Sequence, residues 1–208
     1  MIPLDTLGVF FAASLLLCLA PGPDNIFVLT QSALRGASAG CIVTIGLCSG
    51  LVVHTTAVAL GVAAIFQASA LAFNALKIVG AAYLLYLAWQ AFRASAAGMV
   101  GAGERGLRGW RLYRRGIIMN VTNPKVSIFF LAFLPQFADP ALGSLRLQLM
   151  LLGGLFIVAT LLVFGGIALL AGRLGQWLQR SEKTQLLINR LAGTVFVVLA
   201  IKLASAER

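Results

Sequence analysis

Long apolar runs, separated by short polar connections, are the feature that most constrains the fold of this chain. Of the 208 residues, 60% are hydrophobic, and only 16 Lys or Arg and 6 Asp or Glu residues carry charge. A soluble domain carries roughly 25% charged residues, so most of this surface needs an apolar solvent. This composition excludes disorder, a collagen-like rod and an ordinary soluble enzyme. In lipid only helices and closed barrels pair every backbone group, and uninterrupted apolar runs favour helices. The sequence therefore predicts an all-α membrane protein.

Hydropathy divides the chain into six predicted membrane spans of about 20 residues each. They cover residues 4–28, 41–66, 71–92, 116–137, 145–171 and 186–204. A basic, glycine-rich linker, residues 93–115, separates a first three-span half, residues 1–92, from a second, residues 116–208. With three spans per half, a duplicated second half would be inverted relative to the first, which predicts two inverted three-helix repeats.

Lys and Arg residues are distributed unequally between the two sides of the predicted bundle. Eleven lie in or beside the loops that follow the first, third and fifth spans, four lie on the other side, and Lys125 lies inside a span. Because cytoplasmic loops are enriched in Lys and Arg, the linker 93–115 is predicted to be cytoplasmic and both termini to lie outside. The net charge of +10 then reflects membrane topology and not nucleic-acid binding. The first span has no basic leader before Arg35, so we expect it to be retained.

Pro21-Gly22-Pro23 interrupts the first predicted span. A proline inside a helix removes a backbone donor and frees a carbonyl one turn earlier. In lipid such a break is tolerated only where it is buried in protein or lines a wet cavity. Asp24 and Asn25 follow in the first turn of the next half-helix, where the positive end of the dipole stabilises an anion. These residues predict a discontinuous helix at a binding site. The alternative is a packing kink with Asp24 near the membrane interface.

Asn123-Pro124-Lys125 interrupts the fourth span in a similar way, with the opposite charge. An unpaired lysine at this depth costs about 2.5 to 3.5 kcal/mol, unless its side chain extends to the membrane surface. Aligning Pro23 with Pro124 sets Asp24 opposite Lys125, which is weak support for an internal repeat. Two broken helices with an acid and a base predict a cradle for a zwitterion. Lys125 and half-helix amides would bind a carboxylate, and Asp24 and freed carbonyls would bind an ammonium.

Three further residues are candidates for the same pathway. His54, in the second span, could relay protons, although a lone histidine is more often hydrogen-bonded to a neighbour. Asn120 either lines the cavity that holds Lys125 or caps the helix break. Gly50 and Gly46 form a small-residue pair that permits close helix approach, and packing alone explains such pairs.

The order and spacing of the motifs allow a family resemblance to be stated. The motifs are Pro21-Gly22-Pro23-Asp24-Asn25, then Gly36 and Gly40 before Gly46 and Gly50-Leu51-Val52-Val53-His54, then Gly80-Ala81-Ala82-Tyr83-Leu84-Leu85-Tyr86-Leu87, and finally Asn120 with Asn123-Pro124-Lys125. Over essentially its whole length the chain resembles the LysE/RhtB family of amino-acid exporters. The resemblance implies that the protein is not an enzyme. It implies a transporter that exports amino acids or their derivatives across the bacterial inner membrane, driven by the proton gradient. It places Pro21, Gly22, Pro23, Asp24, Asn123, Pro124 and Lys125 in the translocation site.

The resemblance also bears on substrate and partners. Some family members carry an acidic residue after the second-span glycine, where this chain has Leu51. Fewer negative charges suit a neutral amino acid of the homoserine, threonine or leucine kind. Family habit and the glycine-rich helix faces favour a homodimer. No cofactor is predicted, because the chain has no phosphate-binding glycine loop followed by Lys-Ser or Lys-Thr.

Three alternatives to amino-acid export remain. Export of a metal cation is weakened by the shortage of carboxylates and thiols within the spans. A membrane thiol-disulfide oxidoreductase would need a cysteine in each half, but Cys18, Cys41 and Cys48 all lie in the first. A purely structural membrane subunit would predict that substitutions of Asp24 and Lys125 are silent.

Overall fold

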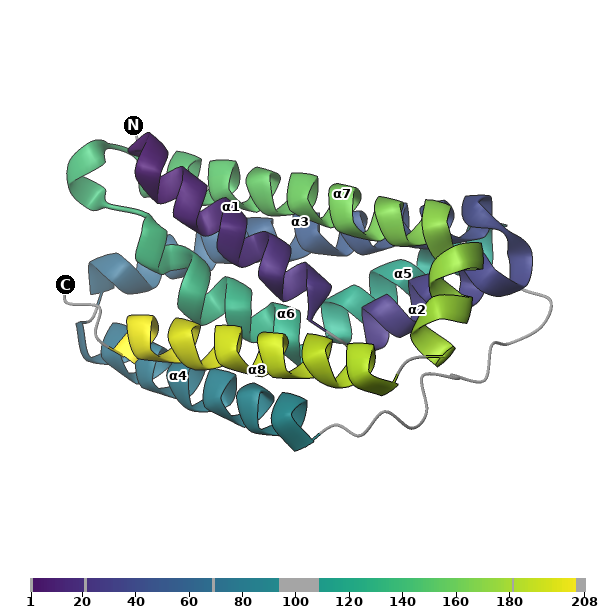
Figure 1. Ribbon diagram of the computed structural model, residues 1–208. Helices are drawn as coiled ribbons and strands as arrows, with labels where there is room; N and C mark the ends of the chain where they lie inside the picture. The colour runs from purple at the N-terminus through teal and green to yellow at the C-terminus, as the bar shows by residue number, and fades with distance from the viewer. Residues whose placement is uncertain (1, 21, 69, 94–108, 181, 205–208) are drawn as a thin grey trace.

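The computed structural model describes residues 2–20, 22–68, 70–93, 109–180 and 182–204, and most of the predicted linker lies outside them. Within these ranges the regular structure is entirely helical. The first half contains α1 (Leu4–Leu19), α2 (Pro23–Arg35), α3 (Ala37–Ala68) and α4 (Ala70–Arg93). The second contains α5 (Gly109–Thr122), α6 (Pro124–Ile128), the π-helix η1 (Phe129–Phe133), the 3₁₀ turns η2 (Leu134–Phe137) and η3 (Pro140–Leu142), α7 (Leu145–Arg180) and α8 (Glu182–Ala204). The helices form an elongated bundle (Figure 1).

The described residues contain between two and four candidate membrane spans. Residues Ala37–Gly61 of α3 and Leu145–Ala171 of α7 are long and apolar enough to cross a membrane on their own. Two bent pairs qualify if each counts as one span: α1 with α2, bent by 61°, and α5 with α6 to η2, bent by 51°. The all-α prediction and both predicted helix breaks are therefore confirmed. The helices at the third and sixth predicted positions, α4 and α8, are not among these candidates, so the six-span count stays a prediction.

Local sequence explains where each bent helix restarts. Pro23 takes the first position of α2 after an extended Gly22, and Pro124 takes the first position of α6 after Asn123. Proline suits this position because its fixed φ is helical and the first amide of a helix has no partner to lose. The side chain of Asn123 also accepts a hydrogen bond from the backbone N–H of Lys125 at 3.0 Å, as an N-cap residue does.

Glycines bring α3 and α5 into backbone contact. A Cβ added to Gly116 would lie 2.6 Å from the carbonyl oxygen of Val43 and 3.1 Å from the Cα of Gly46. No side chain fits between backbones this close, so the contact needs glycine on both helices. The predicted packing role of Gly46 is therefore confirmed, and this contact fixes α5 beside the N-terminal part of α3.

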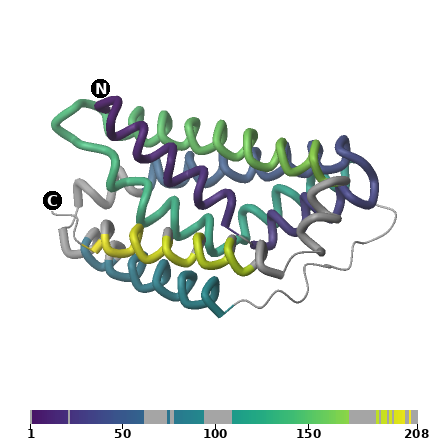
Figure 2. The backbone as a smooth tube through the Cα atoms, in the orientation of Figure 1, coloured from purple at the N-terminus to yellow at the C-terminus, as the bar shows by residue number. Residues whose placement is uncertain are grey.

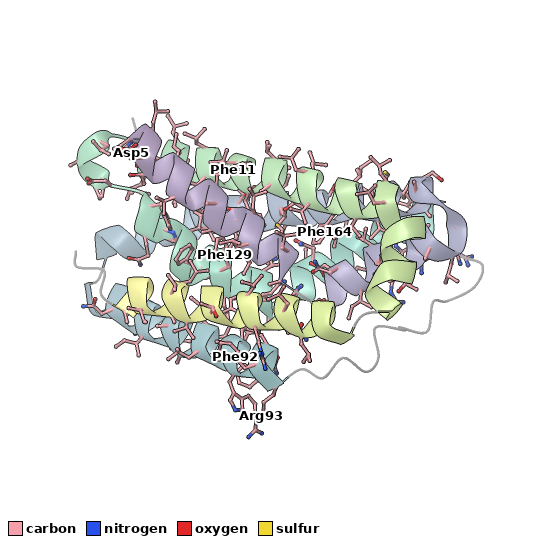
Figure 3. All side chains as sticks on the ribbon, viewed as in Figure 1. Asp5, Phe11, Phe92, Arg93, Phe129 and Phe164 are labelled. Carbon is pink, nitrogen blue, oxygen red and sulfur yellow. The ribbon has the colours of Figure 1, made fainter. Side chains whose placement is uncertain are left out.

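The buried apolar residues form two clusters, and the partly buried Val163 packs against both. The α1-side cluster is rich in aromatic rings and includes Phe10, Phe129, Phe130, Phe133, Phe137 and Phe156. The α2-side cluster consists of Val28, Ala39, Val43, Leu47, Leu112, Phe164 and Ala168. Figure 3 labels one member of each, Phe129 and Phe164. The backbone trace in Figure 2 shows both helix breaks near the middle of the bundle's length.

Candidate functional site

The two helix breaks meet at the side chain of Lys125. Its Nζ donates hydrogen bonds to the carbonyl oxygens of Ala20 at 3.1 Å and Leu17 at 3.3 Å, at the end of α1. A Cβ on Gly22 would lie only 3.1 Å from this Nζ, so the missing side chain leaves room for the ammonium group. The Lys125 residue is 8% exposed. Its side chain therefore does not extend to the membrane surface, which was the alternative left open by the sequence.

A proline explains why one of these carbonyls is free to bind Lys125. In an unbroken helix the carbonyl of Leu17 would accept from residue 21, but Pro21 has no N–H. Pro21 itself lies outside the described residues, so its predicted place in the site is not seen. The next carbonyl along α1, that of Cys18, accepts a hydrogen bond from the Nδ2 of Asn25 at 2.7 Å. The end of α1 also carries the negative pole of its dipole, which further stabilises the ammonium.

Asp24 lies on the other side of the same break, at the start of α2. It lies in the first turn of α2, where the dipole is positive, and is 3% exposed. The side chains of Asn120 and Asn123 are its close neighbours, and Lys125 lies nearby. Its Oδ1 has no hydrogen-bond partner in the protein. The break therefore separates a buried acid from a buried base, each placed at the helix end that stabilises it.

Four buried polar atoms around this break have no hydrogen-bond partner within the protein. They are Oδ1 of Asp24, Oδ1 of Asn25, Oδ1 of Asn120 and Nδ2 of Asn123. Buried polar groups are usually paired, and each unpaired group costs about 1–3 kcal/mol. Three acceptors and one donor on the residues that flank the two breaks are thus left without a partner in the protein. Such a set can bind a small molecule that carries both an ammonium and a carboxylate.

Gly50 and His54, both on α3, hold the end of α5 in place. The Nε2 of His54 lies 3.1 Å from the carbonyl oxygen of Asn120, and its ring packs on Phe130 with 5.6 Å between centroids. A Cβ on Gly50 would lie 2.7 Å from the Cβ and Oδ1 of Asn120. The histidine is thus hydrogen-bonded to a neighbour, as one reading of the sequence expected, and both residues set the position of Asn120.

The two remaining predicted site residues, Pro23 and Pro124, start the helices after the breaks, and their own side chains do not enter the buried site. Pro23 and Pro124 are exposed, while the residues that follow them, Asp24 and Lys125, are buried.

Among the residues that the structure describes, no three His, Cys, Asp or Glu side chains are grouped closely enough to hold a metal ion.

Sequence reasoning missed two polar residues near this region. Thr160, buried on α7, contacts the sulfur of Cys18 at 3.5 Å and donates to Phe156 O. A single threonine in a long apolar run gives little signal of its position. Gln31 is fully buried on α2. Its spacing of seven residues from Asp24, which keeps both on one face of a helix, was a signal that could have found it.

Comparison with known proteins identifies the family. Residues 15–207 match the LysE type translocators. The chain belongs to this family. It is 36% identical over 198 residues to the homoserine/homoserine lactone efflux protein of Salmonella typhi and to that of Salmonella typhimurium, covering 95% of each chain. An uncharacterized membrane protein of Pseudomonas aeruginosa is 31% identical over 207 residues, covering 96% of this chain and 93% of the relative. No solved structure matches the chain significantly. The resemblance noted in the sequence is therefore confirmed, and the chain is a membrane transporter.

In this LysE-family translocator, Gly50→Ala is expected to impair transport strongly. The new methyl group would overlap Asn120 and displace its side chain from the site. Overpacking of this kind typically costs about 1–3 kcal/mol, so thermal stability should fall as well. Transport rate and melting temperature of the purified protein are the measurements.

Gly61→Ala is the matched control on the same helix, because no atom lies within 4 Å of its added Cβ. It should leave transport unchanged, and should stabilise α3 slightly through the higher helix propensity of alanine. Equal behaviour of the two variants would contradict the close contact at Gly50.

Proposed function

We propose that this translocator exports neutral amino acids of the homoserine, threonine or leucine kind across the inner membrane, in exchange for protons. The observation that carries the proposal is the buried cluster of unpaired polar atoms where the two broken helices meet. The homoserine efflux proteins among its relatives support the substrate class.

The cluster suggests a role for each residue. The oxygens of Asp24, Asn25 and Asn120 would accept hydrogen bonds from the substrate ammonium. An ammonium has three donors, and Lys125 uses two of them on the carbonyls of α1, which leaves one for the substrate carboxylate. The unpaired Nδ2 of Asn123 would be a second donor. One acid and one base balance each other, which suits a substrate without net charge.

The contacts between helices support two repeats related by an inverted pseudo-two-fold axis. Equivalent helices pair across the halves, α3 with α7 and α4 with α8. The first broken helix, α1 and α2, packs on α7 as the second, through α5, packs on α3. Likewise α1 contacts α8, and α6 with η1 contacts α4. With each broken helix taken as one unit, exchanging the halves maps these contacts onto one another. Three spans in each half would make the repeat inverted.

The two apolar clusters suggest how access would alternate. The residues around the break, such as Ala20 and Val126, belong to the α1-side cluster, whereas the α2-side cluster begins at Val28, beyond Asp24 on α2. Opening the α2-side cluster would expose the site to one side of the membrane, and parting the α1-side cluster beyond the break would expose it to the other. The basic residues favour a cytoplasmic linker and periplasmic termini. The α2-side cluster would then be the cytoplasmic gate. The predicted homodimer is retained as part of this proposal.

Efflux from proteoliposomes tests this function. Vesicles containing the protein would be loaded separately with labelled homoserine, threonine, leucine and lysine, and with Mn²⁺ for the metal alternative. Homoserine or another neutral amino acid is expected to leave, and to leave faster when an inward proton gradient is imposed. Export of lysine or Mn²⁺ alone would refute the substrate class. Efflux of a neutral amino acid that ignores the gradient would refute proton exchange.

A further inference from the structure

Gln31 is a buried polar residue that the proposed site does not use. The buried residues of α2 are Asp24, Val28, Gln31 and Ser32, so the face of α2 that meets the protein interior is largely polar. Gln31 is 0% exposed. Both its Oε1 and its Nε2 lack a hydrogen-bond partner in the protein. An amide with neither end paired is rare in a protein interior.

Other buried polar side chains of this protein show how unusual this is. Ser32, next in the chain, donates its hydroxyl to Val28 O at 2.7 Å. Gln148 is the closest chemical match, because it too is a buried glutamine. Its amide accepts from the N–H of Asp139 and donates to the carbonyls of Asp139 and Gly143. An apolar residue in place of Gln31 would avoid the desolvation cost. The amide of Gln31 therefore suits a partner that is not part of the chain.

The position of Gln31 indicates what that partner is. It lies seven residues after Asp24 on the same helix face, which at 1.5 Å per residue is about 10 Å along the axis. It lies on the same face of α2 as Val28, a member of the α2-side cluster. Beyond it, α2 ends at Arg35, on the side of the bundle that carries most basic residues. Gln31 thus stands between the candidate site and the proposed cytoplasmic end of α2.

We propose that Gln31 forms a second polar station on the cytoplasmic limb of the pathway, which binds the amino acid before it reaches Asp24. The inference rests on the proposed function and deepens it. The Nε2 donors match the carboxylate of the amino acid, and the Oε1 acceptor matches its ammonium or a side-chain hydroxyl. A separation of about 10 Å exceeds the length of homoserine, so one molecule occupies the two positions in turn.

Gln31→Met tests the station through transport and stability together. Methionine keeps the volume of the side chain and removes its hydrogen-bonding groups. The expected result is a melting temperature equal to or above wild type, with a rise of about tenfold in the homoserine concentration that half-saturates export. Gln148→Met is the matched control and should lower the melting temperature, because it breaks three hydrogen bonds. A more stable Gln31→Met with unchanged half-saturation would overturn the proposal.

Gln31→Cys gives a readout that does not depend on transport. In a background without Cys18, Cys41 and Cys48, it should react with a membrane-impermeant thiol reagent added from the linker side. Homoserine should slow the reaction. Leu84→Cys, at a buried position in the α1-side cluster, should stay unlabelled.

The two assays separate failure of this inference from failure of the proposed function. If the wild type exports amino acids but Gln31→Cys is unlabelled, the station is wrong and the function stands. If labelling occurs and homoserine does not slow it, the station is wrong as an amino-acid site. If the wild type exports no amino acid, the proposed function is wrong, and the station as an amino-acid site is wrong with it.

Discussion

Replacing Asp24 with Asn is expected to abolish amino-acid export while leaving the protein folded and inserted. The carboxylate is buried at the positive end of α2, beside Lys125 and two asparagines. Asparagine keeps the shape of the side chain but loses the charge that would bind an ammonium or a proton. A hydrogen bond to a charged group contributes about 1.5–3 kcal/mol, so export should fall by at least about tenfold to a hundredfold. Efflux of labelled homoserine from proteoliposomes measures the effect.

Asp5→Asn is the matched control for this substitution. Asp5 also lies in the first turn of its helix, α1, but it is exposed and distant in sequence from the break. Its replacement should leave export at the wild-type level, and both variants should show wild-type amounts of protein in the membrane. Wild-type export by Asp24→Asn would remove Asp24 from the site and favour a structural role for the break.

Lys125→Met is expected to lose both export and stability. Removing the ammonium leaves the buried carbonyls of Leu17 and Ala20 without their donor. Each unpaired group costs about 1–3 kcal/mol, so the melting temperature should fall clearly. Export should fall as well, because the substrate carboxylate loses its cationic partner. Thermal unfolding and efflux of the same preparation provide the two measurements.

Arg146→Met is the control for loss of a positive charge. Arg146 is exposed in the first turn of α7, and its removal should change neither measurement substantially. Lys125→Arg adds a second test, because it keeps the charge but places a larger group against Gly22. It should recover part of the stability and little of the export. If Lys125→Met melts at the wild-type temperature, the hydrogen bonds to α1 do not hold the break together.

The helix breaks could be predicted from sequence because their causes are local. Proline without an N–H and glycine without a side chain interrupt a helix wherever they occur, and Asp24 and Lys125 follow them directly. The partner of Lys125 could not be read from the sequence in the same way. The sequence predicted that Lys125 binds a carboxylate, and it gave no sign that the ammonium also binds the carbonyls of Leu17 and Ala20. That contact joins residues more than a hundred positions apart, and only tertiary packing brings them together.

Hydropathy located helices better than it located their ends. The predicted spans 41–66 and 145–171 lie inside the longer helices α3 and α7. A helix continues past its apolar run, because backbone hydrogen bonding does not require apolar side chains. The predicted span 116–137 contains the π-helix η1, which the sequence did not indicate. Its buried phenylalanines pack on Phe10 of α1 and Phe156 of α7, and these long-range contacts accompany the change of helix type.

Binding of labelled homoserine to the purified protein tests the central claim most directly, because it requires neither orientation nor a gradient. Equilibrium dialysis would compare wild type with Asp24→Asn and with the Asp5→Asn control. The account predicts saturable binding to wild type and Asp5→Asn, displaced by unlabelled threonine, and little binding to Asp24→Asn. Equal binding to all three proteins would show that the amino acid binds somewhere other than the junction of the two broken helices.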